Sequence, residues 1–264
     1  MKRYILISFS LLAFALGGCE EVIDYELRTA DTKLVVEGLI TDQPGPYTVR
    51  LSNTKGYLDQ GRTPGVNGAL VIVSDNQGTV DTLKQAGEGT YQTTKLQGKP
   101  GNTYYFKAVV NGQTYTAQSY MPTVSPIDSL TFEHKRKGET MDEGIHPIIH
   151  FADPAGKGDC YRWNVIINGV QQPDELAVLK DDIYDGNYGH ADMGFVLQEN
   201  DRLRVEMYAL DKPAYEFWLA LQNQQNESGG PFEATPANAP GNISNGGIGF
   251  FGASAVSVVE GVSR

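Results

Sequence analysis

Turn-forming residues recur along this chain at intervals of about 8 to 12 residues, which leaves room only for short extended segments between them. The segments between the turns are rich in β-branched and aromatic residues: residues 34–40, 47–51, 69–73, 103–110 and 114–117. Asn111-Gly112 is the strongest turn signal, because a type I′ hairpin turn needs positive φ at both central residues. The spacing predicts a mainly β protein that begins with an immunoglobulin- or fibronectin-like β-sandwich over residues 34–122.

A stretch bracketed by prolines, residues 121–126, predicts a domain boundary after residue 122. Residues 123–264 then form a second β-rich domain. Within it, residues 202–210 alternate apolar and polar side chains, which indicates a half-buried strand. An apolar run near the end, residues 253–259, predicts a closing strand.

One helix is expected in this second domain. Asp211 can cap its first turn, Pro213 suits that turn, and the glycines at 229 and 230 mark its end. Four side chains at helical spacing predict its packing face: Tyr215, Trp218, Leu219 and Gln222.

The first 19 residues indicate an export signal. A short basic start precedes an apolar run that is too short for a bilayer of about 30 Å at roughly 1.5 Å per helical residue. Leu16-Gly17-Gly18-Cys19 matches the bacterial lipobox, in which the chain is cut before the cysteine and the cysteine receives lipid. We therefore predict a lipoprotein signal peptide over residues 1–18, lipid attachment at Cys19 and a tether over residues 19–33.

Charge and cysteine content exclude several classes of protein. The 21 Lys and Arg residues against 32 Asp and Glu give a formal charge of −11, which argues against an electrostatic hold on nucleic acid or anionic lipid. The 2 cysteines are too few for a disulfide framework or a four-cysteine zinc site. With Cys19 carrying lipid, Cys160 is expected to be a small packing residue.

One loop gathers acidic and aromatic side chains. Asp181, Asp185, Gly186 and Asp192 occupy positions 1, 5, 6 and 12 of a calcium-loop pattern, but position 3 is Ile183. A hairpin loop with solvated carboxylates and a weak contact with a ligand or cation are both consistent with this segment. The candidate ligand-binding residues are Asp181, Asp182, Tyr184, Asp185, Tyr188 and His190.

The histidines do not form a metal-binding motif within one segment. His146 and His150 have the spacing of a helical zinc pair, but Pro147 and the isoleucines after it favour a strand. In a strand their rings stand about 13 Å apart, too far to share one ion at about 2 Å from each. We therefore predict no metal and no cofactor, and a metal site would have to be assembled across elements.

No catalytic motif is found either. Gly247-Ile248-Gly249-Phe250-Phe251-Gly252 has the letters of a dinucleotide-binding motif, but a β-branched run follows where that motif needs a helix, so close backbone packing is expected. Sequence patterns of serine and zinc hydrolases are missing. We expect a protein that is not an enzyme and has no catalytic residues, although a carboxylate pair from distant strands would leave no such pattern.

Several segments together with the lipobox resemble one family. They are residues 35–41, 45–52, 66–71, 89–91, 126–130, 153–154 and 242–253, and they resemble the Bacteroidota lipoprotein family called domain of unknown function 4249. The resemblance covers nearly the whole chain after Cys19. It brings no catalytic or binding residues with it.

The resemblance implies an outer-membrane lipoprotein that acts as an accessory or substrate-capturing partner of a TonB-dependent transporter in nutrient uptake. Glu20 and Glu21 directly after Cys19 resemble the signal that sends such lipoproteins to the cell exterior. Two alternatives stay open, a stand-alone glycan- or peptide-binding surface adhesin and a surface hydrolase. Nucleic acid is not an expected partner.

Overall fold

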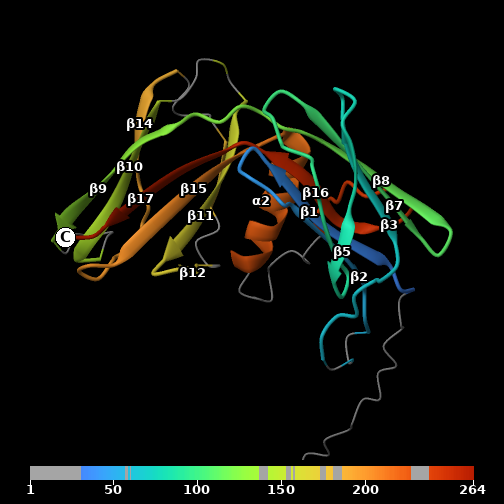
Figure 1. Ribbon diagram of the computed structural model, residues 1–264. Coiled ribbons are helices and arrows are strands. Elements are labelled where there is room, and N and C mark those ends of the chain that lie inside the picture. Colours follow the sequence, from blue (N-terminus) through green and yellow to red (C-terminus); the bar gives the residue numbers. More distant parts are fainter. Residues whose placement is uncertain are drawn as a thin grey trace, which may run out of the picture. The chain divides into compact units, whose positions relative to one another are not determined.

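Short strands make up most of the chain in the computed structural model, which describes residues 31–56, 59, 61–136, 142–152, 156, 158–172, 177–180, 186–226 and 238–264. The strands form four sheets, here called A to D, and the described part has one helix (Figure 1). The mainly β prediction is therefore confirmed.

The predicted signal peptide and Cys19 lie outside the described residues. No helix in the described ranges is both long and apolar enough to cross a membrane.

Sheets A and B share one apolar core. Sheet A has the strand order β16 (Ile248–Ser254), β1 (Leu34–Thr41), β2 (Thr48–Asn53), β6 (Thr90–Gln92) and β5 (Lys84–Gly87). Sheet B has the order β4 (Val80–Thr82), β3 (Leu70–Asp75), β7 (Thr103–Val110) and β8 (Gln113–Tyr120). Across the core, the rings of Phe106 on β7 and Phe251 on β16 stack with centroids 5.4 Å apart. Alternate residues of β3, β7 and β8 supply much of this core because successive side chains point to opposite faces, whereas β5 is exposed along its whole length.

The turn between β7 and β8 confirms its sequence signal. Asn111 has φ 49° and Gly112 has φ 80°, so both central residues adopt the positive φ that the hairpin requires.

Sheets C and D enclose a second core. Sheet C has the order β14 (Tyr188–Asp192), β10 (Gly144–Ala152) and β9 (Ile127–Lys135). Sheet D has the order β12 (Val170–Gln171), β11 (Cys160–Ile167), β15 (Arg202–Leu210) and β17 (Val256–Val262), and β13 (Ala177–Lys180) also pairs with β11. Leu203, Val205 and Met207 of β15 are fully buried here, which confirms the predicted alternation.

The helix α2 (Lys212–Asn226) begins as predicted, and Tyr215 and Trp218 of its predicted face pack against a buried cluster together with Phe217. The Asp211 carboxylate accepts a hydrogen bond from the Ala214 N–H at 2.9 Å, the arrangement of an N-cap. Ala214 is buried, and the Phe217 ring stacks on Phe250 of β16 at 4.8 Å. The sequence pattern did not predict Phe217 because its partner lies on a distant strand.

Asp211 also ties α2 to sheet B. Its second carboxylate oxygen accepts hydrogen bonds from the Ser119 hydroxyl at 3.1 Å and from the Tyr120 N–H at 2.9 Å, both on β8. The Ser119 hydroxyl in turn accepts a hydrogen bond from the Ala253 N–H of β16 at 3.0 Å. One carboxylate therefore connects the start of the helix, the edge of sheet B and, through Ser119, sheet A.

A strand near the end of the chain, β16, pairs with the first strand, β1. β16 pairs with β1 in parallel, from Val35 opposite Ile248 to Thr41 opposite Ser254, and Figure 1 shows the red strand beside the blue one. The other strand pairings in the described ranges are antiparallel. The predicted closing strand at residues 253–259 is instead shared between the end of β16 and β17.

Glycine makes the parallel pairing possible. Gly249 has φ 91°, and a Cβ at this position would overlap the carbonyl oxygen of Val36. The glycine-rich segment thus packs backbone against backbone, as the sequence predicted.

The predicted division at residue 122 stays a prediction. Residues Thr32–Arg264 form one compact unit by their contacts. β16, which the sequence assigned to the second domain, is part of sheet A. A division of the chain into two consecutive domains therefore does not describe sheet A completely.

We expect Gly249→Ala to destabilise the fold far more than Gly246→Ala. Gly246 also has positive φ, 73°, but an added Cβ there meets nothing within 4 Å. The backbone strain common to both variants costs about 1 to 3 kcal/mol. Gly249→Ala also forces β16 away from β1, so its loss should exceed about 4 kcal/mol. Urea unfolding measures both values, and equal losses would contradict the role of the close approach.

Candidate functional site

A groove of about 700 Å³ runs over the outer face of sheet B. Side chains that point away from the core form its floor: Ile72 and Ser74 of β3, Tyr105 and Lys107 of β7, and Thr116 and Gln118 of β8. The segment at residues 241–244 forms one wall beside the edge of β8. The groove therefore combines residues from the first and second halves of the sequence.

Hydrogen bonds fix the wall to β8. The Ser244 N–H donates to the Thr116 carbonyl oxygen at 2.9 Å, and the Thr116 N–H donates to the Ser244 hydroxyl at 2.8 Å. The Asn242 side-chain amide donates to the carbonyl oxygens of Gln118 at 3.1 Å and of Phe251 at 2.7 Å. Because these backbone groups are paired, the groove is preformed and its wall is rigid.

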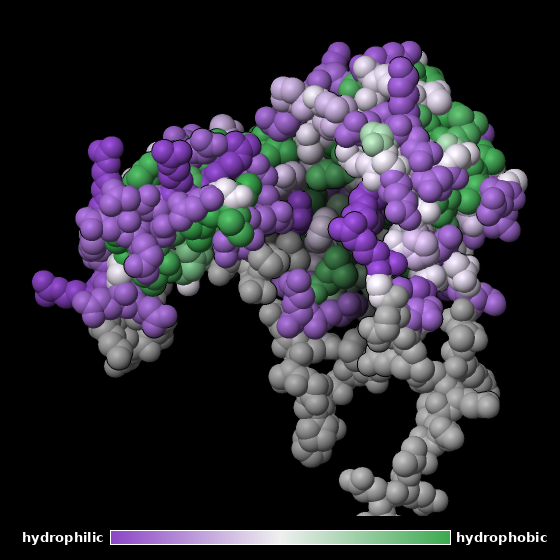
Figure 2. Space-filling view, turned by 60° about the horizontal axis from the view of Figure 1, so that its bottom comes forward, coloured by the Kyte–Doolittle hydropathy of each residue, from purple (hydrophilic) through white to green (hydrophobic). Residues whose placement is uncertain are grey.

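The same sheet face exposes large apolar and aromatic side chains. Four of them have exposed fractions between 41% and 52%: Leu70, Val80, Tyr105 and Tyr120. Figure 2 shows that apolar patches interrupt the polar surface on the side of the molecule it views. Exposed apolar side chains that share one sheet face are consistent with a binding surface.

The groove offers two kinds of contact. Tyr105 presents a flat ring, while Ser74, Lys107 and Gln118 offer hydrogen-bonding groups around it. A ligand with both a flat apolar face and polar edges matches this lining. Sugars and peptides are ligands of this kind.

Only part of the predicted ligand-binding loop can be placed. Asp181, Asp182, Tyr184 and Asp185 lie outside the described residues. Tyr188 and His190 lie on β14, and Tyr188 is 61% exposed. The ring of Tyr188 stacks on that of His150 with centroids 6.4 Å apart.

The buried side chain of His146 on β10 lies beside the Asp192 carboxylate on β14. His146 and His150 lie on one strand, β10, as predicted. His146 is 1% exposed, its Nε2 is 2.8 Å from the Asp142 carbonyl oxygen, and its Nδ1 is 3.5 Å from the Asp192 carboxylate. Burial raises the pKa of Asp192, but hydrogen bonds and the charge of Lys135, 2.6 Å away, outweigh burial and lower it. Position 12 of the calcium-loop pattern is therefore occupied by an ion pair.

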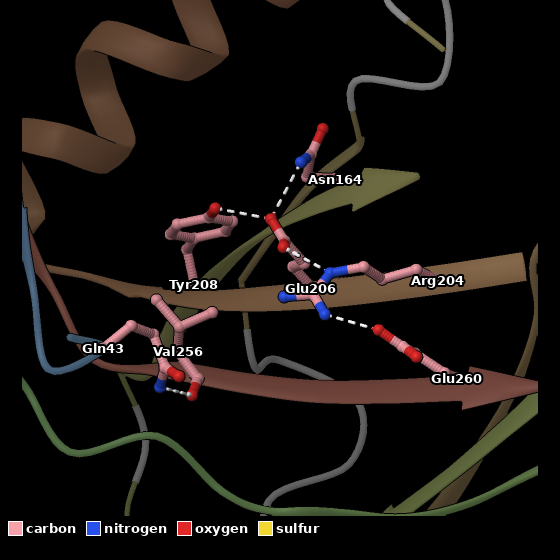
Figure 3. A network of polar contacts seen from close by, with 7 residues as sticks. All are labelled: Gln43, Asn164, Arg204, Glu206, Tyr208, Val256 and Glu260. Carbon is pink, nitrogen blue, oxygen red and sulfur yellow. Dashed lines mark hydrogen bonds and ion pairs between the residues drawn. The ribbon is translucent and has the colours of Figure 1, made fainter. Parts of the chain in front are cut away.

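A polar network lies on the outer face of sheet D (Figure 3). The Glu206 carboxylate accepts hydrogen bonds from the Tyr208 hydroxyl at 2.6 Å, the Asn164 amide at 2.9 Å and the Arg204 guanidinium at 2.8 Å. Arg204 also pairs with Glu260 on β17. Burial raises the pKa of Glu206, but these donors outweigh it and hold the pKa below its ordinary value. Glu206 is thus a fixed anion, whereas a general acid at neutral pH needs a raised pKa.

The guanidinium group of Arg162 lies against two aromatic rings beside this network. Its guanidinium carbon lies 4.6 Å from the centre of the Tyr208 ring and 4.2 Å from that of Trp218 on α2. Burial lowers its pKa, against the opposing effects of Tyr208 and Glu206. The two rings hold the cation by cation–π attraction.

The buried carboxylate of Asp81 stabilises the fold. It accepts hydrogen bonds from the N–H groups of Thr94, Lys95 and Leu96 and from the Thr94 hydroxyl, at 2.7 to 2.8 Å. These bonds outweigh burial and lower its pKa.

Cys160 is buried as predicted, at the start of β11. In the described ranges no group of three or more His, Cys, Asp or Glu residues could hold a metal ion.

Comparison with known proteins gives the family. The pattern of the family described as domain of unknown function, DUF4249, matches residues 20–259. The chain belongs to the DUF4249 family. No curated protein matches it significantly.

The groove of this DUF4249 protein was missed at the sequence level. Tyr105 and Lys107 alternate with the buried Tyr104 and Phe106 on β7, so a two-residue period is the signal that could have placed them on the outer face. What the sequence did not reveal is the wall, because residues 241–244 follow Thr116 by more than a hundred positions.

We expect Tyr208→Phe to destabilise the DUF4249 fold by about 1 kcal/mol near neutral pH, because Glu206 loses one hydrogen bond. The folded-state pKa of Glu206 is depressed, so its ionisation stabilises the fold above the unfolded value of about 4.3 and ceases to do so as pH falls. The loss should therefore shrink below about pH 4.

Urea unfolding at about pH 7 and pH 3 tests this expectation. Tyr105→Phe is the matched control, because that tyrosine is exposed, and it should leave stability unchanged at both values. A Tyr208→Phe loss that does not depend on pH would contradict the assigned role of Glu206.

Proposed function

We propose that this DUF4249 protein is a surface-exposed outer-membrane lipoprotein that captures substrate for a TonB-dependent transporter in nutrient uptake. The lipobox ending at Cys19, the acidic residues after it and the family match from residue 20 support the lipid anchor and the address. The observation that carries the binding role is the preformed groove on sheet B. The protein acts on its ligand by binding and not by catalysis.

The groove suits capture of small polar ligands. An exposed tyrosine ring stacks on a flat ligand face, and neighbouring hydroxyl, amide and ammonium groups orient it. The wall residues are fixed by hydrogen bonds, so little ordering is lost on binding. We also infer that residues 34–122, completed by β16, form an immunoglobulin- or fibronectin-type sandwich, which holds the groove on a rigid sheet.

A second candidate function is stand-alone binding of glycans or peptides at the cell surface. The exposed Tyr188 ring, stacked on His150 of sheet C, favours it, because this second aromatic surface is separate from the groove. Such an adhesin needs no receptor.

We expect the protein to copurify with a TonB-dependent receptor from outer membranes solubilised in mild detergent. Mass spectrometry of the captured complex identifies the partner. Cys19→Ala, which removes the expected lipid attachment point, should reduce the amount of the protein in the membrane fraction. Repeated capture without any receptor would contradict the transport role.

The groove is tested on glycan and peptide arrays with residues 20–264. Tyr105→Ala and Lys107→Ala should each weaken binding about tenfold or more, equivalent to about 1.4 kcal/mol. Tyr188→Ala on β14 is the matched control and should leave binding unchanged. If Tyr188→Ala abolishes binding and the groove variants retain it, the second surface is the site and the adhesin function is favoured.

A further inference from the structure

Two histidines from different strands face each other on sheet C. In the pairing of β10 with β14, His150 lies directly opposite His190. Residues in such positions point to the same face of the sheet, with Cβ atoms about 4.5 to 5.5 Å apart. The two imidazole rings are 6.4 Å apart between centroids and tilted by 33°.

From this spacing, small side-chain rotations can bring the two rings to one metal ion. A tetrahedral ion with metal–nitrogen bonds of about 2.0 to 2.1 Å places two imidazole nitrogens roughly 3.4 Å apart. Rings at the observed separation can reach this distance by side-chain rotation, because the backbone register already aligns their Cβ atoms. The sheet thus supplies the alignment that His146 and His150 lack along a single strand.

The surroundings of the pair match a histidine metal site. The Thr131 hydroxyl lies 2.9 Å from His150 Nε2, so it can orient the ring and leave Nδ1 for an ion. His190 is exposed and His150 half-buried, so water can complete the coordination shell. His146 is buried and contacts Asp142 and Asp192, so it is not a third ligand.

We propose that His150 and His190 form a binding site for a divalent transition-metal ion such as Zn²⁺, Ni²⁺ or Cu²⁺. Imidazole nitrogen suits these ions and not Ca²⁺ or Mg²⁺, which prefer oxygen. Two protein ligands leave the remaining positions to water, so the ion exchanges readily. The site needs neither the groove nor a receptor, and it stands independently of the proposed function.

The test uses the full chain, purified in mild detergent without a polyhistidine tag. Calorimetric titration with ZnCl₂, NiCl₂ and CuCl₂ should give saturable binding of one ion per chain. His150→Gln and His190→Gln should each weaken it at least tenfold. His134→Gln is the matched control, because His134 is an exposed histidine on β9 outside the pair, and it should leave affinity unchanged. Thr131→Val should weaken binding about tenfold through the orientation of His150.

A second measurement does not depend on the folding of variants. In the wild-type chain, added Zn²⁺ should shift the ring NMR signals of His150 and His190 and leave those of His134 unchanged. The proposal is overturned if the wild-type chain shows no saturable binding. It is also overturned if the two ring signals do not move, or if the folded double variant binds as tightly as the wild type.

Discussion

The parallel pairing of β1 with β16 is the constraint on which the rest of the structure depends. It adds the last part of the chain to the first sheet, and it is possible because Gly249 lets one backbone approach the Val36 carbonyl. β16 places Phe251 in the core shared by sheets A and B and Phe250 against the Phe217 ring of α2. The segment just before it becomes the wall of the groove. Pairing of segments this distant in sequence slows folding, and the core and the groove are complete only with the C-terminal strand in place.

The charged and polar groups fall into two sets: one set is bonded to other groups of the protein, and the other faces solvent. Asp81, Asp192, Glu206 and Asp211 each accept several hydrogen bonds or an ion pair from the protein itself, and they stabilise turns, sheets and the helix start. The groups that face solvent near exposed aromatic rings are instead Lys107 and Gln118 on sheet B and His190 on sheet C. The exposed groups that could contact a ligand therefore lie on outer sheet faces, whereas these four carboxylates are bonded to other groups of the fold.

Local patterns predicted local structure well. The Asn111-Gly112 turn, the alternation along β15 and the Asp211 cap depend on neighbouring residues, so the sequence carries their whole cause. Features that join distant segments could not be derived in this way. Nothing near Gly249 indicates Val36 as its neighbour, and nothing near His150 indicates His190, because strand order and register decide both pairs. The packing face of α2 includes the predicted Tyr215 and Trp218 but is wider than predicted for the same reason, since Phe217 meets a ring on β16. Of the six residues predicted to bind ligand, Tyr188 and His190 are placed, on one strand beside His150.

The position of β1 also governs how the protein responds to mechanical force. Any pull on the segment that precedes residue 34 enters the fold through β1, which has β2 on one side and β16 on the other. Along the strand axis such a pull loads both ladders in shear, so that many hydrogen bonds must fail together and cannot open one at a time. Resistance to forced unfolding is set by the rate of that event and not by equilibrium stability. The strand that closes the fold thus also reinforces the end at which a tether would pull.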